Sequence, residues 1–336
     1  MMMQAENLGS ANAMRPASRV FVAGHRGLVG SAICRQLTAA GYHHLLLRTS
    51  RELDLADRSA VWNFFKSEHP EYVVLAAAKV GGIHANQTYP VDFIRDNLLI
   101  QSNVIDACYE FGVTRLLFLG SSCIYPKLCP QPIREEYLLT GPLEPTNRPY
   151  AVAKIAGIEQ CFAYNRQHKT QFLAAMPTNL YGPGDNFDLA NSHVLPALLR
   201  KVAMAKAAGS PQVEVWGTGA PRREFLYSDD LAEACIFLLQ LPDDRFASLL
   251  REDEPPLVNI GAGEDISIRE LAELICDILE YRGSLTFNTA QPDGTPRKLL
   301  DSSRIRALGW KPKVSLDDGI RRTVAAAKSV LDSARV

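Results

Sequence analysis

The sequence lacks any apolar run long enough to cross a bilayer, which takes about 20 consecutive residues. It also lacks an excess of one charge, since 36 Lys and Arg stand against 37 Asp and Glu. That balance disfavours nucleic acid or a membrane as the main partner, although local basic clusters could still bind a phosphorylated substrate. With 336 residues, 47% of them hydrophobic, the composition predicts one large two-lobed globular domain or two domains.

Cysteines at regular spacing are lacking as well. The seven cysteines are scattered, odd in number and without metal-ligand spacing, so we expect free thiols, no metal site and a reducing compartment. Residues 1–18 contain no apolar segment of the secretory type and too little Arg for a transit peptide. We therefore expect them to form a disordered leader, and the protein to be cytoplasmic.

A glycine-rich loop between a short apolar strand and a helix is the first candidate binding site. The strand covers Arg19–Ala23, and helical periodicity continues over residues 28–41 and ends at Gly41. Glycines allow a tight turn and a close backbone approach, so a pyrophosphate can sit at the helix N-terminus. The strand–loop–helix order favours dinucleotide binding over a purely structural turn. The candidate cofactor residues are Gly24, His25, Arg26, Gly27, Leu28, Val29 and Gly30.

The second expected strand, His44–Leu47, has no acidic residue directly at its tip. An acid at that position would receive the ribose hydroxyls of NAD, whereas Arg accommodates the 2′-phosphate of NADP. Arg26 of the first loop, together with Arg48 or Arg51, therefore indicates NADP(H) as the cofactor. Each of these arginines could instead be an ordinary exposed loop charge, so the missing acid is the stronger observation.

Strands and helices alternate through the first half of the chain. The apolar runs Val73–Ala78 and Arg115–Leu119 are typical of buried parallel strands, and a helix over 93–111 lies between them. This alternation predicts an α/β fold with a Rossmann-type doubly wound parallel sheet. A Pro/Gly turn at Gly182–Gly184 then indicates the crossing to a smaller C-terminal α/β substrate lobe.

These patterns predict the domain boundaries. We expect the NADP-binding Rossmann domain over residues 19–180 plus about 224–262, and the substrate-binding lobe over 181–223 plus about 263–325. The segment beginning at Arg223 is predicted to open a helix that runs to about residue 240. Val258–Gly261 is predicted to be the last short strand.

Tyr150 and Lys154 form the most informative pair in the chain. Their spacing of four places them on one face of a helix, one turn apart. A nearby ammonium favours the phenolate and so lowers the pKa of the phenol. Such a tyrosine can protonate an alkoxide as hydride reaches a carbonyl. The same spacing also occurs on ordinary exposed helix faces. The pair indicates a catalytic site only because the glycine loop lies upstream in the same chain.

Cys123 and His193 are candidates for a second acid–base pair. If strand geometry persists beyond Leu119, Cys123 shares a pocket with Ser121, because residues two apart face the same side. A thiol beside cations can become a thiolate and remove a carbon-bound proton next to a ketone. Two alternatives stay open: Cys123 is a buried apolar residue, and His193 is a structural residue at the start of a helix.

The glycine spacing and the set Ser121, Tyr150 and Lys154 resemble the pattern of extended short-chain dehydrogenase/reductases. More specific segments are AGHRGLVGSAI (23–33), LAAAKVGGIHAN (75–86), LLFLGSSCIYPK (116–127), EPTN (144–147), AKIAGI (153–158), MPTNLYGP (176–183), NSHVLPALLR (191–200) and PDGTPRKLLD (292–301). Through these segments the sequence closely resembles the GDP-L-fucose synthase family from about residue 19 to 320.

The resemblance implies an NADPH-dependent enzyme that epimerises and reduces GDP-4-keto-6-deoxy-D-mannose. Cys123 would be the base and His193 the acid at carbons three and five. Tyr150 would then protonate the oxygen on carbon four, with Ser121 holding that oxygen and Lys154 binding ribose. The resemblance places further cofactor contacts at Leu119, Gly120, Ser121, Ser122, Lys154, Pro177, Thr178, Asn179, Leu180 and His193. It places substrate contacts at Lys201, Trp216, Arg223 and Asp293.

Several positions depart from the family pattern. Lys201 stands where Arg is usual, which keeps the charge but loses bidentate geometry. Asp188 and Tyr227 stand where histidines are common, and Ser50 replaces an Arg of some members. None of these changes removes a catalytic group, so they affect substrate affinity and cofactor preference rather than reaction type.

Two other functions fit parts of the pattern. One is an NAD-dependent sugar-nucleotide 4-epimerase or 4,6-dehydratase, which would not need the pair Cys123 and His193. The other is a non-catalytic NADP-binding sensor, which need not keep these acid–base groups together. The helices near 93–111 and 151–168 could pair across a twofold axis, so a homodimer is expected.

Overall fold

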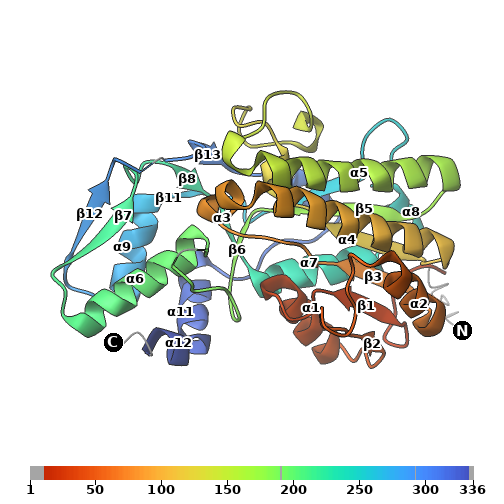
Figure 1. Ribbon diagram of the computed structural model, residues 1–336, viewed down its shortest axis with the longest axis horizontal. Helices are drawn as coiled ribbons and strands as arrows, with labels where there is room; N and C mark the ends of the chain where they lie inside the picture. The colour runs from red at the N-terminus through yellow and green to blue at the C-terminus, as the bar shows by residue number, and fades with distance from the viewer. Residues whose placement is uncertain (1–10, 190, 292, 333–336) are drawn as a thin grey trace, which may run out of the picture.

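A six-stranded parallel sheet forms the centre of the computed structural model, which describes residues 11–189, 191–291 and 293–332 (Figure 1). Its strand order, β2-β1-β3-β4-β5-β10, confirms the predicted Rossmann-type α/β fold. Ligands bind such sheets where the strand order reverses, here at the carboxyl ends of β1 and β3. The strands are β1 (Val20–Ala23), β2 (Leu45–Leu46), β3 (Tyr72–Leu75), β4 (Arg115–Leu119), β5 (Phe172–Pro177) and β10 (Leu257–Ile260).

Helices cover both faces of this sheet because its strands are apolar on both sides. Val20 and Val22 of β1 join the core beneath α1 and α7, whereas Phe21 and Ala23 join the core beneath α2, α4 and α5. Figure 1 shows α4 and α5 lying side by side along the sheet. The helices are α1 (Leu28–Ala39), α2 (Arg58–Glu68), α3 (Ile83–Thr88), α4 (Pro90–Glu110), α5 (Arg148–His168), α7 (Ser228–Gln240), α8 (Asp243–Ala247) and α10 (Ser303–Ala307).

A third core lies under the elements on the left of Figure 1. Strand β7 pairs with β12 in parallel, and alternate residues such as Val213 and Val215 are buried against the helices there. The domain boundaries at residues 181, 224 and 263 stay predictions. The elements around this core are α6 (Val194–Ala208), β7 (Gln212–Trp216), α9 (Ile268–Ile278), β12 (Ser284–Asn288), α11 (Leu316–Ala326) and α12 (Lys328–Asp332).

Short strands link this part to the central sheet, and here two predictions are wrong. The segment from Arg223 does not begin a helix, because it forms β8 (Arg222–Arg223) and β9 (Phe225–Tyr227) before α7 starts at Ser228. Strand β9 pairs with β6 (Asn179–Tyr181). The predicted last strand, which is β10, is followed by three more: β11 (Ile266–Ser267), β12 and β13 (Arg297–Lys298).

The expected disordered leader is also wrong in its second half. Met14 is 3% exposed, and its backbone N–H donates to the carbonyl of Leu239 in α7. The hydroxyl of Tyr42 donates to the carbonyl of Met14. Residues 11–18 therefore pack on the Rossmann core, whereas residues 1–10 lie outside the described part of the chain.

Within the described ranges, no helix combines the length and apolar character needed to cross a membrane. Among the same residues, no group of His, Cys, Asp and Glu gathers in a way that could hold a metal ion. All seven cysteines are free. Five of them lie in helices, namely Cys34, Cys108, Cys161, Cys235 and Cys276.

Candidate active site

The loop after β1 has the shape that a bound pyrophosphate requires. Gly24 has a φ of +84°, which favours glycine, and a Cβ on Gly30 would lie 2.1 Å from the carbonyl oxygen of Gly24. Gly27 is the N-cap of α1, so no side chain caps the first N–H groups of that helix. These free donors and the helix dipole can stabilise an anion, and the loop therefore fits a dinucleotide.

The predicted NADP arginines differ in their surroundings. The guanidinium of Arg48 contacts the carboxylate of Glu68 at 2.6 Å and lies over the ring of Phe64, so it is already engaged. Arg26 and Arg51 are exposed, and among the described residues neither guanidinium has a hydrogen bond or ion pair. The Nδ1 atom of His25 is buried and has no hydrogen-bond partner among the described residues. Arg26 and Arg51 are thus better placed than Arg48 to receive an additional phosphate.

The loop after β4 brings Ser121 and Cys123 together. The Oγ atom of Ser121 and the Sγ atom of Cys123 are 2.8 Å apart. The geometry differs from the expected one, because strand β4 ends at Leu119 and residues Ser122–Ile124 form a 3₁₀ turn capped by Ser121. The tight turn, rather than an extended strand, places the two side chains side by side. Cys123 is 7% exposed.

Lys154 of α5 lies beneath this loop. Its side chain is 3% exposed, and its Nζ donates a hydrogen bond of 2.8 Å to the carbonyl of Leu119. Burial lowers the pKa of Lys154 to about 8, although the nearby thiol of Cys123 opposes this shift. The Nζ atom lies 5.8 Å from the ring centroid of Tyr150, so the helical spacing does bring the two residues together.

The expected effect of Lys154 on Tyr150 is wrong for this structure. Burial raises the pKa of Tyr150, and the neighbouring Cys123 raises it further. Desolvation is thus the main cause of the shift, and the ammonium of Lys154 donates to the carbonyl of Leu119. The phenol stays protonated at neutral pH, which suits a proton donor. The ring of Phe93 packs edge-on against Tyr150, with the ring centroids 6.2 Å apart.

His193 is the N-cap of α6, and the loop before it reaches the central sheet. The backbone N–H of Gly82, after β3, donates to the carbonyl of Asn191 at 3.2 Å. Burial lowers the pKa of His193, and the positive charge of Lys298 lowers it further. His193 is therefore mostly neutral at pH 7, and its protonated form releases a proton readily. Burial also lowers the pKa of Lys298, and the neighbouring Cys123 opposes that shift.

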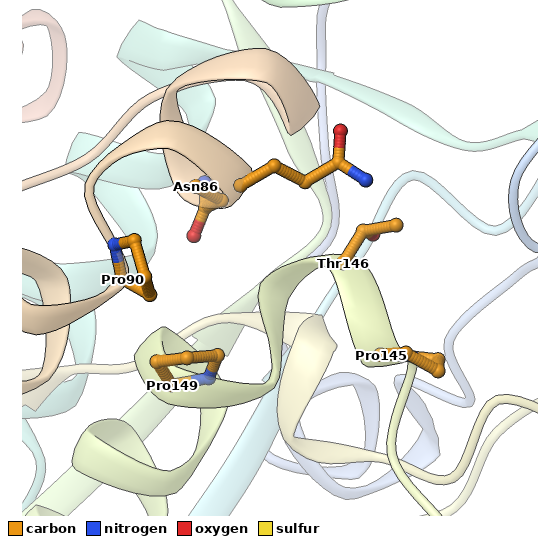
Figure 2. Close-up of a pocket in the computed structure, with 6 residues that line it drawn as sticks. Asn86, Pro90, Pro145, Thr146 and Pro149 are labelled. Atoms are coloured by element: carbon orange, nitrogen blue, oxygen red, sulfur yellow. The ribbon is translucent and has the colours of Figure 1, made fainter.

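A pocket of about 390 Å³ opens beside this region (Figure 2). Asn86 of α3 lies across it from Pro149, which directly precedes Tyr150 in α5. The Oδ1 atom of Asn86 is buried and has no hydrogen-bond partner among the described residues. The pocket is lined by Asn86, Gln87, Pro90, Pro145, Thr146 and Pro149. None of these six is among the catalytic, cofactor-binding or substrate-binding residues that the sequence predicted.

The predicted substrate residues form two groups. In the first, the Nζ of Lys201 lies 5.1 Å from the ring centroid of Trp216. Trp216 is 56% exposed, which leaves its ring available for stacking. In the second, Asp293 accepts hydrogen bonds from the backbone and hydroxyl of Thr218, and it acts electrostatically on Arg223. Burial lowers the pKa of Arg223, and Asp293 opposes that shift.

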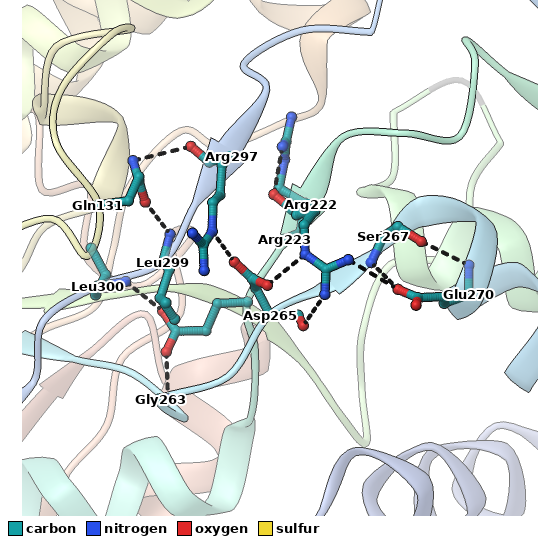
Figure 3. A network of polar contacts seen from close by, with 11 residues as sticks. Gln131, Arg222, Arg223, Gly263, Asp265, Ser267, Glu270, Arg297, Leu299 and Leu300 are labelled. Carbon is teal, nitrogen blue, oxygen red and sulfur yellow. Dashed lines mark hydrogen bonds and ion pairs between the residues drawn. The ribbon is translucent and has the colours of Figure 1, made fainter.

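Polar contacts hold the strand of Arg223 in place (Figure 3). Asp265 accepts from Arg222 and from Arg297, the neighbours of Arg223 and Lys298 in β8 and β13. The buried carboxylate of Glu224 accepts backbone hydrogen bonds from Gly263 and Leu300, at 2.7 and 3.0 Å. Arg223 and Lys298 are register partners in these parallel strands.

Sequence reasoning missed Lys298 and Glu144. Both act electrostatically within the site: Lys298 lowers the pKa of His193, and Glu144 opposes the lowered pKa values of Arg223 and Lys298. Their positions fall in PDGTPRKLLD and EPTN, two segments that carried the family resemblance. Those segments could have pointed to Lys298 and Glu144 as candidate site residues. No local sequence pattern, however, shows that the two segments lie close together in space.

Known proteins share both the sequence and the fold of this chain. A model described as the NAD dependent epimerase/dehydratase family matches residues 20–261. GDP-L-fucose synthase 1 of Arabidopsis thaliana is 57% identical and covers 95% of this chain and 96% of its own length. GDP-L-fucose synthase of Escherichia coli (strain K12) is 54% identical, with coverages of 91% and 95%.

Solved structures agree. A GDP-mannoheptose C4 reductase from Campylobacter jejuni with NADP bound has a TM-score of 0.86 at 41% identity, over 94% of this chain and 99% of that one. A GDP-L-fucose synthetase from Naegleria fowleri bound to NADP has a TM-score of 0.83 at 28% identity, with coverages of 96% and 98%. The chain therefore belongs to the NAD dependent epimerase/dehydratase family and, within it, groups with the GDP-L-fucose synthases.

Proposed function

We propose that this enzyme converts GDP-4-keto-6-deoxy-D-mannose into GDP-L-fucose by epimerisation at carbons three and five and NADPH-dependent reduction at carbon four. The observation that carries the proposal is the contact between Ser121 and Cys123, 2.8 Å, beside the partly buried Tyr150 and the buried Lys154. This contact supports the proposal that groups for both reactions meet at the carboxyl end of β4. The GDP-L-fucose synthases of A. thaliana and E. coli support this substrate.

The cofactor proposal rests on the fit described above. The loop from Gly24 to Gly30 would hold the pyrophosphate, Arg26 and Arg51 the 2′-phosphate, and Lys154 the ribose. When bound, NADPH would supply the hydride for carbon four. We include Arg48, Leu119–Ser122, Pro177–Leu180 and His193 among the residues that would contact NADPH.

For epimerisation, the chain must remove a proton from one face of carbon three or five and return one to the other. The ketone at carbon four acidifies both C–H bonds, so one base can serve each in turn. We assign Cys123 as the base, because its sulfur lies beside the Ser121 hydroxyl that would hold the ketone oxygen. His193 would return the proton, and its lowered pKa makes that proton easy to release.

For reduction, Tyr150 would protonate the oxygen on carbon four. Its raised pKa keeps the phenol protonated until negative charge develops on that oxygen. Lys201, Trp216, Arg223 and Asp293 would hold the GDP part of the substrate. Arg223 suits a pyrophosphate and Trp216 a stacked base.

The proposal includes the assembly and location of the protein. The exposed side chains of Leu99 and Tyr109 on α4 and of Val152 on α5 could pair across a twofold axis in a homodimer. Seven free cysteines favour a reducing cytoplasm.

The test is turnover of GDP-4-keto-6-deoxy-D-mannose with NADPH in deuterated water, followed by NMR and mass analysis of the sugar. GDP-L-fucose with deuterium at carbons three and five is the expected product. Reduction without deuterium would make this chain a simple C4 reductase, like the structural relative from C. jejuni. Turnover of UDP- or GDP-sugars with NAD alone would favour a 4-epimerase or dehydratase, and binding without turnover a sensor.

Cofactor preference provides a separate prediction. Replacing both Arg26 and Arg51 by Ala should raise the KM for NADPH by about 10- to 100-fold, because each guanidinium would make a charge-assisted hydrogen bond to the 2′-phosphate. The KM for NADH should not change, since NADH has no such phosphate. Arg95→Ala, which removes an exposed arginine paired with Asp96, is the matched control. An equal rise for both cofactors would show that these arginines do not read the 2′-phosphate.

A further inference from the structure

Asn86 of α3 is a buried asparagine whose side-chain orientation is fixed by the preceding loop. It is 5% exposed, and its Nδ2 donates to the carbonyls of Gly81 and Gly82, at 2.8 and 3.0 Å. An amide oxygen in the place of Nδ2 would face these two carbonyl oxygens, and none of the three could donate. The atom turned away from the loop is therefore Oδ1, which can only accept hydrogen bonds.

This oxygen lies in the wall of the pocket between α3 and the start of α5. Figure 2 shows it directed toward Pro90 and Pro149, two of three prolines in the wall, which have no backbone N–H to donate. The backbone N–H and the hydroxyl of Thr146 donate to Glu144 instead. Among the described residues Oδ1 has no hydrogen-bond partner, although it is buried. Such an acceptor costs free energy, and a donor on a ligand would remove that cost.

The pocket adjoins both segments that carry candidate acid groups. On the α5 side, Pro149 lines it and directly precedes Tyr150. On the α3 side, Asn86 holds Gly82, and a Cβ on Gly82 would lie 2.9 Å from the carbonyl oxygen of Ser192. Ser192 directly precedes His193, so the loop before α6 packs on the same turn. A hexose held between the two candidate acids would therefore lie beside this pocket.

We propose that the pocket is a subsite for the hexose of the substrate, in which Oδ1 of Asn86 accepts a hydrogen bond from a sugar hydroxyl. This inference deepens the proposed function and rests on it, since it assumes a GDP-sugar substrate. The hexose of GDP-4-keto-6-deoxy-D-mannose carries hydroxyls only at carbons two and three, so the donor is one of these. Apolar walls with one fixed polar group are typical of pockets that orient a ligand.

The test measures binding without turnover. Isothermal titration calorimetry compares GDP, GDP-mannose, and two GDP-mannose analogues in which fluorine replaces the hydroxyl at carbon two or three. Asn86→Leu keeps the size of the side chain but removes the amide. We expect it to weaken GDP-mannose binding by about 3- to 10-fold and to leave GDP binding unchanged. With the analogue that lacks the contacted hydroxyl, wild type and variant should bind equally, because the hydrogen bond is already lost.

Asn165→Leu is the matched control. Its amide also donates to a backbone carbonyl, that of Phe172, but it lies near the opposite end of α5 from Tyr150. This variant should leave all four affinities unchanged. Thermal unfolding checks each variant, and Asn86→Ala replaces Asn86→Leu if the latter does not fold.

Several outcomes would overturn the subsite. An equal loss for every ligand would mean that Asn86 only holds its loop in place, and an unchanged affinity for GDP-mannose would mean that the pocket holds only water. A loss that persists with both fluorinated analogues would also overturn it, because the substrate has no other hydroxyl on its hexose. If the wild-type protein bound neither GDP nor GDP-mannose, the proposed function would fall and the subsite with it.

Discussion

Tyr150→Phe should lower the rate of NADPH oxidation with GDP-4-keto-6-deoxy-D-mannose by about 10²- to 10⁴-fold, the range that a positioned general acid supplies. The phenol is the proton donor that the oxygen on carbon four would meet, and burial raises its pKa so that it arrives protonated. Phe keeps the ring that packs against Phe93, so the fold should persist. Stopped-flow absorbance of NADPH measures the loss.

The same variant should still exchange deuterium at carbons three and five. Epimerisation needs Cys123 and His193, which the substitution leaves in place. Tyr109→Phe, at a phenol on the exposed face of α4, should keep both activities and serves as the matched control. Loss of exchange in Tyr150→Phe, with the control unaffected, would contradict separate roles for the two sets of residues.

Cys123→Ser should have the opposite effect on the two reactions. A hydroxyl of nearly the same size preserves the contact with Ser121, but at neutral pH it is a far weaker base than a thiol beside cations. We expect deuterium exchange at carbons three and five to fall by about 10²-fold or more. NMR of the recovered sugar measures the exchange at each carbon separately.

Two comparisons complete this experiment. Cys34→Ser, at a partly buried cysteine of α1, should leave exchange unchanged. If Cys123→Ser exchanged at the wild-type rate, Cys123 would be a buried apolar residue, as the alternative reading of the sequence has it. Loss at only one carbon would mean that a different base serves the other.

Much of the central fold could be predicted because it depends on short segments. Apolar runs such as Arg115–Leu119 are strands in the structure, with burial along their whole length. The glycines before α1 act through their own backbone, and Tyr150 and Lys154 meet because a helix brings residues four apart together. Such features follow from local periodicity and need no knowledge of distant neighbours.

Other features depend on segments far apart in the chain. Strands β8 and β13 are two residues each, too short for a periodic pattern, and they exist because each supplies hydrogen bonds to the other. Met14 is buried because Leu239 and Tyr42 meet it there, although its own segment resembles a leader. No window of sequence contains both partners of these contacts.

The sequence by itself determined the residue types of the site: the glycine loop, Ser121, Cys123, Tyr150, Lys154 and His193. Only the tertiary structure decided their electrostatics, because desolvation and the field of Lys298 come from surrounding segments. The spacing of Tyr150 and Lys154 predicts a lowered pKa for the phenol, and burial reverses that sign. The sequence specifies which chemical groups the site contains, and the packing around those groups sets their protonation states.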